Sequence, residues 1–327
     1  MKKIKVGIVG GAGYTGGELI RILVNHPTIE IVFVQSKSNG NKYIYEVHTD
    51  LIGELDLKFS TTISQDIDVL FLCMAHRESR KFLLENIIKD SIKIIDLSQD
   101  FRLNSDEAND NRKFAYGLPE LNREQIKAAQ NVSNPGCFAT CIQLALLPLA
   151  ANLLLKNEVH VSATTGSTGA GQSLSSSAHF SWRSSNISIY KSFEHQHLQE
   201  INQSMIQLQQ SFNKAINFIP HRGNFTRGIF ASCYLECDIE IRDAISMYES
   251  YYFDHPFVFI SKENIDLKQV VNTNKCLLYI EKHEQKLIIV SVIDNLLKGA
   301  SGQALQNMNL LFGLPETTGL KLKASAF

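Results

Sequence analysis

Concentrated positive charge is missing from this chain. Its 327 residues carry 32 lysines and arginines against 33 aspartates and glutamates, and the formal net charge at pH 7 is −1. Proteins that bind nucleic acid need a basic patch or stripe that neutralises phosphates, and no basic block interrupts this sequence. We therefore do not expect nucleic acid as a partner, and a small molecule is the expected ligand.

Long apolar runs are also missing, and no leader segment is expected. No stretch approaches the roughly 20 apolar residues that span a bilayer, and the chain enters a strand-like segment from Lys3. A secretory signal would place a basic and then an apolar stretch there instead. With 44% hydrophobic residues, the composition is that of a globular protein, which we expect to be cytoplasmic.

The sequence also lacks the Cys-x-x-Cys pairs that are typical of metal sites. Alternation over 229–239 places Cys233 and Cys237 on one face of a strand, as core thiols. Cys141 is expected to pack inside a helix, with a resolving thiol as the alternative. We expect a reduced protein without a metal, because no Cys-x-x-Cys pair occurs. The six cysteines are Cys73, Cys137, Cys141, Cys233, Cys237 and Cys276.

A glycine loop stands between the first strand and the first helix. Residues 3–9 read as a short buried strand, and Gly10, Gly13 and Gly16 follow before a helix that continues through Leu23. Glycines in this context let the backbone approach a pyrophosphate, which then faces the positive end of the helix. The sequence therefore predicts a dinucleotide site at this loop.

An acidic residue is missing where the second strand ends. Sites for NAD usually place a carboxylate there, on the ribose 2′-hydroxyl. The strand expected at 29–34 is followed instead by Gln35, Ser36 and Lys37, with a further lysine at position 42. A hydroxyl and two cations suit a 2′-phosphate, so we predict that the cofactor is NADP(H) and that Ser36 and Lys37 bind it. An ordinary solvated loop is the alternative.

The two halves of the chain differ in their predicted secondary structure. Strands expected at 68–73 and 92–97 flank a helix near 79–88, and this alternation predicts a Rossmann-type α/β domain with a parallel, doubly wound sheet. The second half predicts an α+β domain with a largely antiparallel sheet. Its expected strands are 158–165, 228–241, 275–281 and 286–293, and its expected helices are 197–212, 243–253 and 301–311.

A cysteine stands at the expected start of an apolar helix. Asn134, Pro135 and Gly136 form a turn before Cys137, and the helix is expected over 138–155. A helix N-terminus carries unpaired N–H groups and about half a positive charge, which favours thiolate over thiol. We therefore predict a nucleophilic cysteine, with a buried structural thiol as the alternative. The domain boundary is placed at this turn, so that 1–136 bind the dinucleotide and 137–298 form the catalytic and dimerisation domain.

Several segments together resemble the N-acetyl-γ-glutamyl-phosphate reductase family, NADPH-dependent enzymes of arginine biosynthesis. The resemblance implies that Tyr14, Thr15 and Asn295 also bind the cofactor. It implies that 299–327 pack back on the nucleotide domain, and that the protein is a homotetramer or a homodimer. The matching segments are 10–19, 96–103, 116–120, 133–137, 166–171 and 294–309.

The resemblance makes Cys137 the nucleophile, and the chemistry explains the need for one. A carboxylate resists hydride, so the substrate is an acyl phosphate; thiolate attack releases phosphate and leaves a thioester that hydride reduces to the aldehyde. His197 is the implied general acid–base and His195 its neighbour, whereas His221 is the rival. Gln196 departs from the arginine that the family usually has there.

Anion-binding residues are also implied. Resemblance to the wider superfamily that includes aspartate-semialdehyde dehydrogenase assigns Arg102 to the acyl phosphate, which a planar guanidinium binds in a bidentate manner. Asn134 is a further substrate-binding residue. Arg227 and Arg222 are expected to hold the substrate carboxylate, although a solvated salt bridge is the favoured interpretation of Arg222. The glycine-rich loop at 166–171 is expected to close over substrate, with Gln172 where arginine is common.

Three other functions remain open at this point. An N-succinyl substrate would use the same chemistry, and so would an aspartate-semialdehyde dehydrogenase. A regulator that binds NADP without catalysis would have lost the cysteine or the glycine loop, and both are intact.

Overall fold

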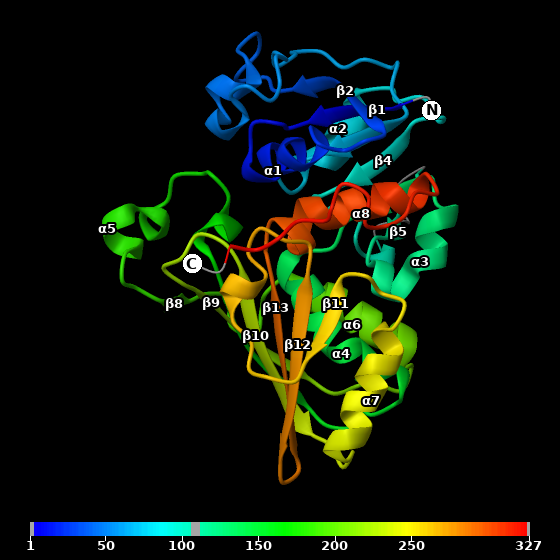
Figure 1. The fold of residues 1–327 in the computed structure, drawn as a ribbon, viewed down its shortest axis with the longest axis vertical. Helices are drawn as coiled ribbons and strands as arrows, with labels where there is room; N and C mark the ends of the chain where they lie inside the picture. Colours follow the sequence, from blue (N-terminus) through cyan, green and yellow to red (C-terminus); the bar gives the residue numbers. More distant parts are fainter. Residues whose placement is uncertain (1–2, 106–111, 326–327) are drawn as a thin grey trace. The chain divides into compact units, whose positions relative to one another are not determined.

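The chain forms two compact units, here described from a computed structural model over residues 3–105 and 112–325 (Figure 1). The first unit joins the N-terminal segment up to Pro135 with residues 300–321. The second runs from Gly136 to Gly299, and residues 322–325 group with it.

The first unit is built on a six-stranded sheet in which every pairing is parallel. The strand order is β2-β1-β3-β4-β6-β5. The strands are β1 (Ile4–Val9), β2 (Ile29–Gln35), β3 (Val69–Leu72), β4 (Lys93–Asp96), β5 (Ala115–Tyr116) and β6 (Asn131–Ser133). Its helices are α1 (Tyr14–Leu23), α2 (Glu78–Glu85), α3 (Pro119–Ala128) and α8 (Gly302–Leu311).

The sequence explains why this sheet is parallel and covered. Every residue of β3 is buried, as expected for a strand with helices over both faces. The chain passes from β1 to β2 on one side and then crosses to β3 on the other, so the order reverses between β1 and β3. Open sheets of this kind bind ligands outside the carboxyl ends of the strands at that reversal.

Helix α8 returns to the first unit from the far end of the sequence. It packs against α1, α3 and β4, and all ten of its residues are buried. Its amides find partners despite this burial: Asn307 donates to the Gly117 carbonyl, and Asn309 donates to the carbonyls of Glu316 and Thr318. The polar side chains of α8 therefore tie it to its surroundings at specific points.

The second unit is built on a mixed, mostly antiparallel sheet of seven strands. Their order is β11-β12-β13-β10-β7-β9-β8. The strands are β7 (Val159–Thr165), β8 (Ser188–Ile189), β9 (Ile216–Arg222), β10 (Ile229–Glu236), β11 (Val258–Ser261), β12 (Cys276–His283) and β13 (Lys286–Ile293). The helices are α4 (Cys137–Ala151), α5 (Phe180–Arg183), α6 (His197–Leu208) and α7 (Ile241–Tyr252).

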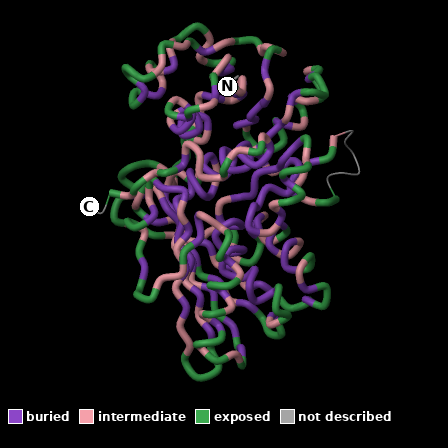
Figure 2. Tube along the Cα trace, turned by 45° about the vertical axis from the view of Figure 1, so that its right-hand side comes forward, coloured by how far each residue is buried: buried purple, intermediate pink, exposed green. Residues whose placement is uncertain are grey.

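The predicted fold class is confirmed in both units, and the alternation in β10 is seen directly. Ile229, Ala231, Cys233 and Leu235 are buried, whereas the residues between them are partly or fully exposed. Figure 2 shows the same change from buried to exposed positions along the strands. Helix α4, by contrast, is buried all round and contacts α6, α7, β10, β12 and β13. It is the central helix of this unit.

Some element bounds differ from the expected ones for physical reasons. The strand expected at 228–241 ends at Glu236, because its partner β13 begins opposite, at Lys286. The helix expected at 138–155 ends at Ala151, and Leu153 then takes a left-handed φ of 58°. Strand β9 was not predicted, since Pro220 interrupts its pattern. No helix in the described ranges has the length and apolar character of a bilayer span.

Candidate functional site

Cys137 is the first residue of α4 in the second unit. Gly136 precedes it in an extended conformation, with φ −69° and ψ 152°, and accepts the first helical hydrogen bond from Thr140. Two glycines make room for the cysteine. A Cβ on Gly299 would lie 2.8 Å from the Cys137 Cβ, and one on Gly136 would lie 2.2 Å from Nε2 of His197. The cysteine therefore stands at the positive end of a helix, beside a histidine.

His195 and His197 come together at the start of α6, as expected. Their ring centroids are 4.6 Å apart, both are buried, and the Phe138 ring contacts each of them edge-on. The backbone N–H of His197 donates to Nδ1 of His195 at 3.2 Å. His195 thus holds the start of α6, and the ring of His197 lies against the turn before the cysteine.

Glu200 links the histidine to the cysteine turn. One carboxylate oxygen accepts the Gly136 N–H at 2.9 Å, and the other lies 3.9 Å from Nε2 of His197. The side chain is 3% exposed. A buried carboxylate in this position orients both the imidazole and the cysteine turn. No role was predicted for Glu200, although it lies in the segment that pointed to the histidines.

The protonation state of His195 follows from its surroundings. Burial, together with the nearby charge of Lys191, lowers the pKa of His195 to about 4. The ring is therefore neutral near pH 7, as its acceptor role at Nδ1 requires. The Lys191 ammonium donates to the side-chain oxygen of Gln196 at 3.0 Å. Gln196, at the position where an arginine was expected, therefore binds a positively charged side chain.

Tyr190 and Arg222 form a second polar group near the cysteine. The Arg222 guanidinium carbon lies 4.7 Å from the centre of the Tyr190 ring, and this ring contacts His195 at 5.8 Å. Burial, and next to it the charge of Cys137, raises the pKa of Tyr190 to about 12. Its hydroxyl therefore remains a donor. Among the described residues, Nε of Arg222 is buried without a hydrogen-bond partner.

Arg227 is held by a buried carboxylate. Its Nε and Nη2 donate to the two oxygens of Asp294 at 3.0 and 3.1 Å. Asp294 also accepts the backbone N–H groups of Asn272, Leu296 and Leu297. This pair therefore organises the segment that leads to Gly299.

Asn295 lies in the second unit and is also engaged. Its side-chain oxygen accepts the Gly228 N–H at 2.7 Å, and its amide nitrogen donates to the Thr168 hydroxyl at 3.0 Å. It thereby ties the glycine-rich turn at Ser167–Ala170 to the end of β13.

The glycine loop follows β1 at the carboxyl edge of the first sheet, where a dinucleotide is expected. Gly10 has a φ of 77°, and a Cβ there would lie 2.6 Å from the Cys73 carbonyl oxygen. A Cβ on Gly16 would lie 2.6 Å from Gly11. Gly13 differs, since nothing lies closer than 3.9 Å to the place of its Cβ. Two of these glycines are required by the fold, whereas Gly13 leaves an opening for a ligand.

Residues beside this loop have the exposure that a ligand site needs. Tyr14 is 40% exposed at the start of α1, and Thr15 is partly buried. Ser36 is buried at the end of β2, with its hydroxyl 3.4 Å from that of Ser38, and Lys37 is exposed. The loop and this polar segment follow paired strands, β1 and β2, at the same edge. The donor groups therefore fit a phosphorylated dinucleotide.

Arg102 and Asn134 lie together in the first unit. Arg102 is 5% exposed and donates to the carbonyls of Asn134 and Leu97 at 2.9 and 3.0 Å. The Asn134 side chain donates to Ala300 and accepts from Asn307. Asp96, at the end of β4, accepts the Ser98 hydroxyl at 2.7 Å. Burial raises the pKa of Asp96 to about 6, although the hydrogen bond from Ser98 opposes the shift.

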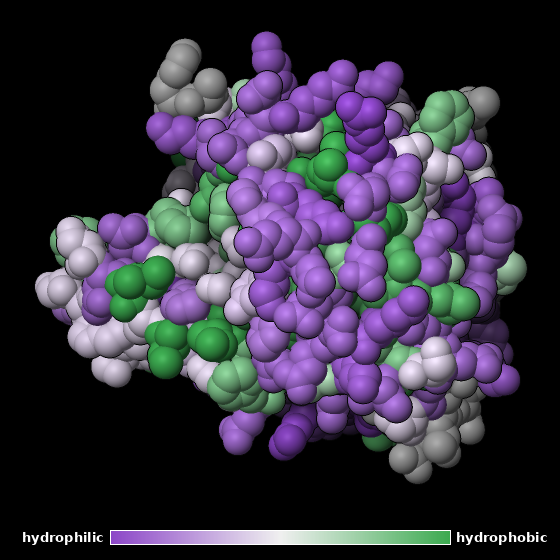
Figure 3. All heavy atoms as spheres, turned by 90° about the horizontal axis from the view of Figure 1, so that it is seen from below, coloured by the Kyte–Doolittle hydropathy of each residue, from purple (hydrophilic) through white to green (hydrophobic). Residues whose placement is uncertain are grey.

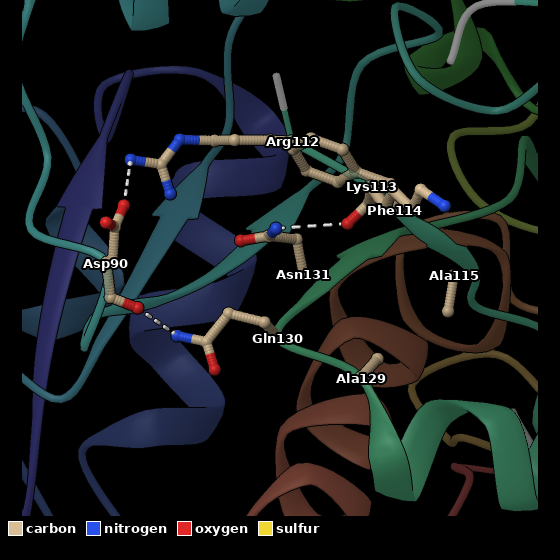
Figure 4. Close-up of a pocket in the computed structure, with 8 residues that line it drawn as sticks. All are labelled: Asp90, Arg112, Lys113, Phe114, Ala115, Ala129, Gln130 and Asn131. Atoms are coloured by element: carbon tan, nitrogen blue, oxygen red, sulfur yellow. Dashed lines mark hydrogen bonds and ion pairs between the residues drawn. The ribbon is translucent and has the colours of Figure 1, made fainter. Parts of the chain in front are cut away.

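Two open cavities contain none of the predicted site residues. One, of about 460 Å³, lies where β4, β5 and β6 begin, and Figure 4 shows Asp90, Arg112, Gln130 and Asn131 around it. That is the amino edge of a parallel sheet, opposite the edge where ligands bind. The other, of about 580 Å³, lies beside Phe225, Phe230 and Leu267. The described residues contain no cluster of three metal-ligating side chains.

Comparison with known proteins identifies the two units. Residues 5–129 match the semialdehyde dehydrogenase NAD-binding domain, and residues 137–295 match the semialdehyde dehydrogenase dimerisation domain. The first match supports a nicotinamide cofactor. Aspartate semialdehyde dehydrogenase II of Vibrio cholerae has the same fold, with a TM-score of 0.74 and 15% identity over 96% of this chain and 99% of that one.

Closer relatives cover almost the whole chain. The N-acetyl-γ-glutamyl-phosphate reductase of Parabacteroides distasonis is 58% identical over 99% of this chain and all of the relative. That of Flavobacterium johnsoniae is 54% identical with the same coverage. These identities confirm the resemblance drawn from the sequence segments. The chain belongs to the N-acetyl-γ-glutamyl-phosphate reductase family.

Proposed function

We propose that this protein reduces N-acetyl-γ-glutamyl phosphate to N-acetylglutamate 5-semialdehyde and phosphate, with NADPH as the reductant, in arginine biosynthesis. The observation that carries the proposal is the position of Cys137. It begins a buried helix, with His197 against the preceding glycine and Glu200 bonded to the turn. This is the arrangement that an activated nucleophile and its acid–base partner need.

The residues of the second unit perform the covalent chemistry in this proposal. The Cys137 thiolate attacks the acyl carbon, the bond to phosphate breaks, and a thioester forms. Backbone N–H groups at the start of α4 stabilise the oxyanion. His197 donates the proton that the carbonyl oxygen gains when the thioester is reduced, and it takes that proton back as the C–S bond breaks. NADPH supplies the hydride.

Glu200 and His195 act through His197. Glu200 fixes the imidazole and the cysteine turn together, because its two oxygens face one each. His195 remains neutral and accepts the His197 N–H, which sets the start of α6. We propose both as positioning residues rather than proton donors.

Substrate anions are assigned to the arginines. Arg102 and Asn134 bind the acyl phosphate. Arg227 and Arg222 bind the α-carboxylate. The contacts favour Arg222 for direct binding, since Nε has no partner in the described part of the chain, and Arg227 is already bidentate to Asp294. Asn295 holds the 166–171 turn, which we propose to lie beside the nicotinamide.

NADP(H) is proposed over NAD(H) on the residues after β2. The hydroxyl of Ser36 and the ammonium of Lys37 replace the carboxylate that would bind a free 2′-hydroxyl. The glycine loop, with Tyr14 and Thr15, binds the pyrophosphate. In domain terms, residues 1–136 and 299–327 bind the dinucleotide, and 137–298 carry the catalysis.

A homo-oligomer, either a dimer or a tetramer, is part of the proposal. The second unit matches a dimerisation domain, and it exposes a group of large apolar side chains around α5. Figure 3 shows hydrophobic atoms on the projecting side where Figure 1 places α5. Patches of this kind mark interaction sites. The exposed residues include Leu174, Phe180, Trp182, Ile187, Ile189 and Phe193.

The reverse reaction tests the proposal directly. The protein is mixed with N-acetylglutamate semialdehyde, phosphate and NADP⁺, and NADPH is followed by absorbance. We expect turnover that requires all three reactants. Parallel reactions with aspartate semialdehyde and with the N-succinyl analogue test the two related enzymes. A higher kcat/KM for either compound would replace the proposed substrate, and an absence of turnover with all three would leave only cofactor binding.

A further inference from the structure

A buried histidine touches the glycine loop from its inner side. His48 lies between two short 3₁₀ turns, Ile44–Glu46 and Thr49–Leu51, and is buried. Its Nε2 is 2.8 Å from the carbonyl oxygen of Gly11. A carbonyl only accepts, so Nε2 carries the proton and donates to it. Nothing in the sequence motifs pointed to this residue.

The hydrogen bond fixes the orientation of one peptide group. The Gly11–Ala12 peptide is planar and trans, so its C=O and N–H point in opposite directions. Because the Gly11 carbonyl points inward to His48, the Ala12 N–H points away from the core. The N–H groups of Gly10 and Gly11 instead donate to the Gln35 carbonyl.

The outward side of this peptide is the open side of the loop. Gly13 has no atom within 3.9 Å of the place of its Cβ, and the loop leads into the N-terminus of α1. An outward N–H there would donate to a bound anion, whereas a flipped peptide would present a carbonyl oxygen to it. The direction of this single peptide therefore changes both the sign and the strength of the contact.

Gly17 leaves the space that the His48 ring occupies. A Cβ on Gly17 would lie 2.5 Å from Cε1 and 2.6 Å from Nδ1 of His48. The Phe59 ring is also near the imidazole, with its centroid 6.3 Å away. Gly17 lies within α1, where alanine would be the better helix former. Its lack of a side chain is explained by the space that the imidazole occupies.

We propose that His48 is a positioning residue of the dinucleotide site, which holds the Gly11–Ala12 peptide so that the Ala12 N–H donates to the pyrophosphate. This inference rests on the proposed NADP(H) cofactor. It assigns a function to a buried donor that makes no contact with the reacting atoms.

Equilibrium binding to two ligands tests the role of His48. NADP⁺ contains the pyrophosphate, whereas 2′-AMP carries the adenosine and the 2′-phosphate without it. His48→Phe keeps a ring without the donor, and His48→Gln keeps an N–H₂ donor without the ring. Calorimetric titration of the wild type and both variants with both ligands separates the lost hydrogen bond from lost packing.

We expect His48→Phe to bind NADP⁺ roughly ten- to a hundredfold more weakly. This is the effect of losing one hydrogen bond to a charged group, here the bond from the Ala12 N–H to the pyrophosphate. Its affinity for 2′-AMP is expected to be unchanged, and His48→Gln is expected to recover most of the NADP⁺ affinity. Gly17→Ala, which displaces the ring without changing the histidine, is expected to weaken NADP⁺ in the same selective way. In steady-state kinetics, the KM for NADP⁺ rises while the KM for phosphate does not.

Three results would overturn the inference. They are NADP⁺ binding by His48→Phe that equals the wild type, equal weakening of NADP⁺ and 2′-AMP, and a His48→Gln variant as weak as His48→Phe. A wild-type protein that binds no NADP⁺ would instead refute the proposed cofactor.

Discussion

The two units of this protein shape their sites by different means. The first unit uses backbone: Gly10 and Gly16 are required by close contacts, and Gly13 leaves an opening. The second unit uses buried titratable side chains, with His195, His197 and Glu200 all at most 6% exposed. A backbone site binds an anion without changing its own charge, whereas the side-chain site can move a proton. Binding and chemistry should therefore be separable by substitution.

The largest expected effect comes from Cys137→Ser. A serine hydroxyl is a far weaker nucleophile at neutral pH, so turnover should fall by at least about a thousandfold. NADPH affinity should survive, because the glycine loop belongs to the other unit. Steady-state assays and NADPH fluorescence titration measure the two quantities. A parallel loss of affinity would break the proposed separation.

Glu200→Gln should have the next largest effect. The glutamine amide oxygen can still accept the hydrogen bond from the Gly136 N–H, but the side chain no longer carries the negative charge that faces His197. We therefore expect kcat to drop roughly tenfold to a hundredfold, within the range of general acid–base catalysis.

The matched control for this variant is Glu194→Gln, which changes an exposed carboxylate in the same segment. Its kcat should equal that of the wild type. Equal loss in both variants would argue for a general charge effect instead of the specific contact of Glu200.

Lys37→Glu tests the backbone unit. Reversing this exposed charge should cut the preference for NADPH over NADH roughly tenfold, and less at high salt because the contact is screened. Lys89→Glu is the control. It makes the same charge change on an exposed residue that precedes β4, at the amino edge of the sheet. An unchanged cofactor ratio in Lys37→Glu would contradict the proposed 2′-phosphate contact.

The last expected effect is on stability, and its sign differs between the units. The pKa of His195 is lowered from 6.5 to about 4, so the unfolded chain binds the extra proton and stability is lost as pH falls through this window. The pKa of Asp96 is raised from 3.8 to about 6. Its protonated form is favoured in the folded state, so its contribution is lost as pH rises.

Thermal unfolding of His195→Asn and Asp96→Asn between pH 4.5 and 7 measures these opposite signs. On acidification, His195→Asn should gain stability relative to the wild type and Asp96→Asn should lose it. Each difference should reach about 1 to 3 kcal/mol. The same sign in both variants would contradict the assigned protonation states.

What the sequence predicted depends on whether a feature is local or long-range, and both units contain each kind. Glycines at 10, 13 and 16 and the apolar run after Cys137 are local signals, and each indicated its element correctly. Glu200 and Gly136 are 64 positions apart, and His48 is 37 positions from Gly11. Periodicity contains no information about such contacts, because tertiary packing brings the partners together.

A covalent intermediate on Cys137 is the central claim, and trapping it is the most direct test. The protein is mixed with N-acetyl-γ-glutamyl phosphate without NADPH, quenched in acid, and digested for mass spectrometry. We predict an N-acetylglutamyl adduct on the peptide that contains Cys137, which hydroxylamine removes and Cys137→Ser does not form. The account would be contradicted if the protein turned over the acyl phosphate with NADPH but formed no adduct on Cys137 when NADPH was omitted.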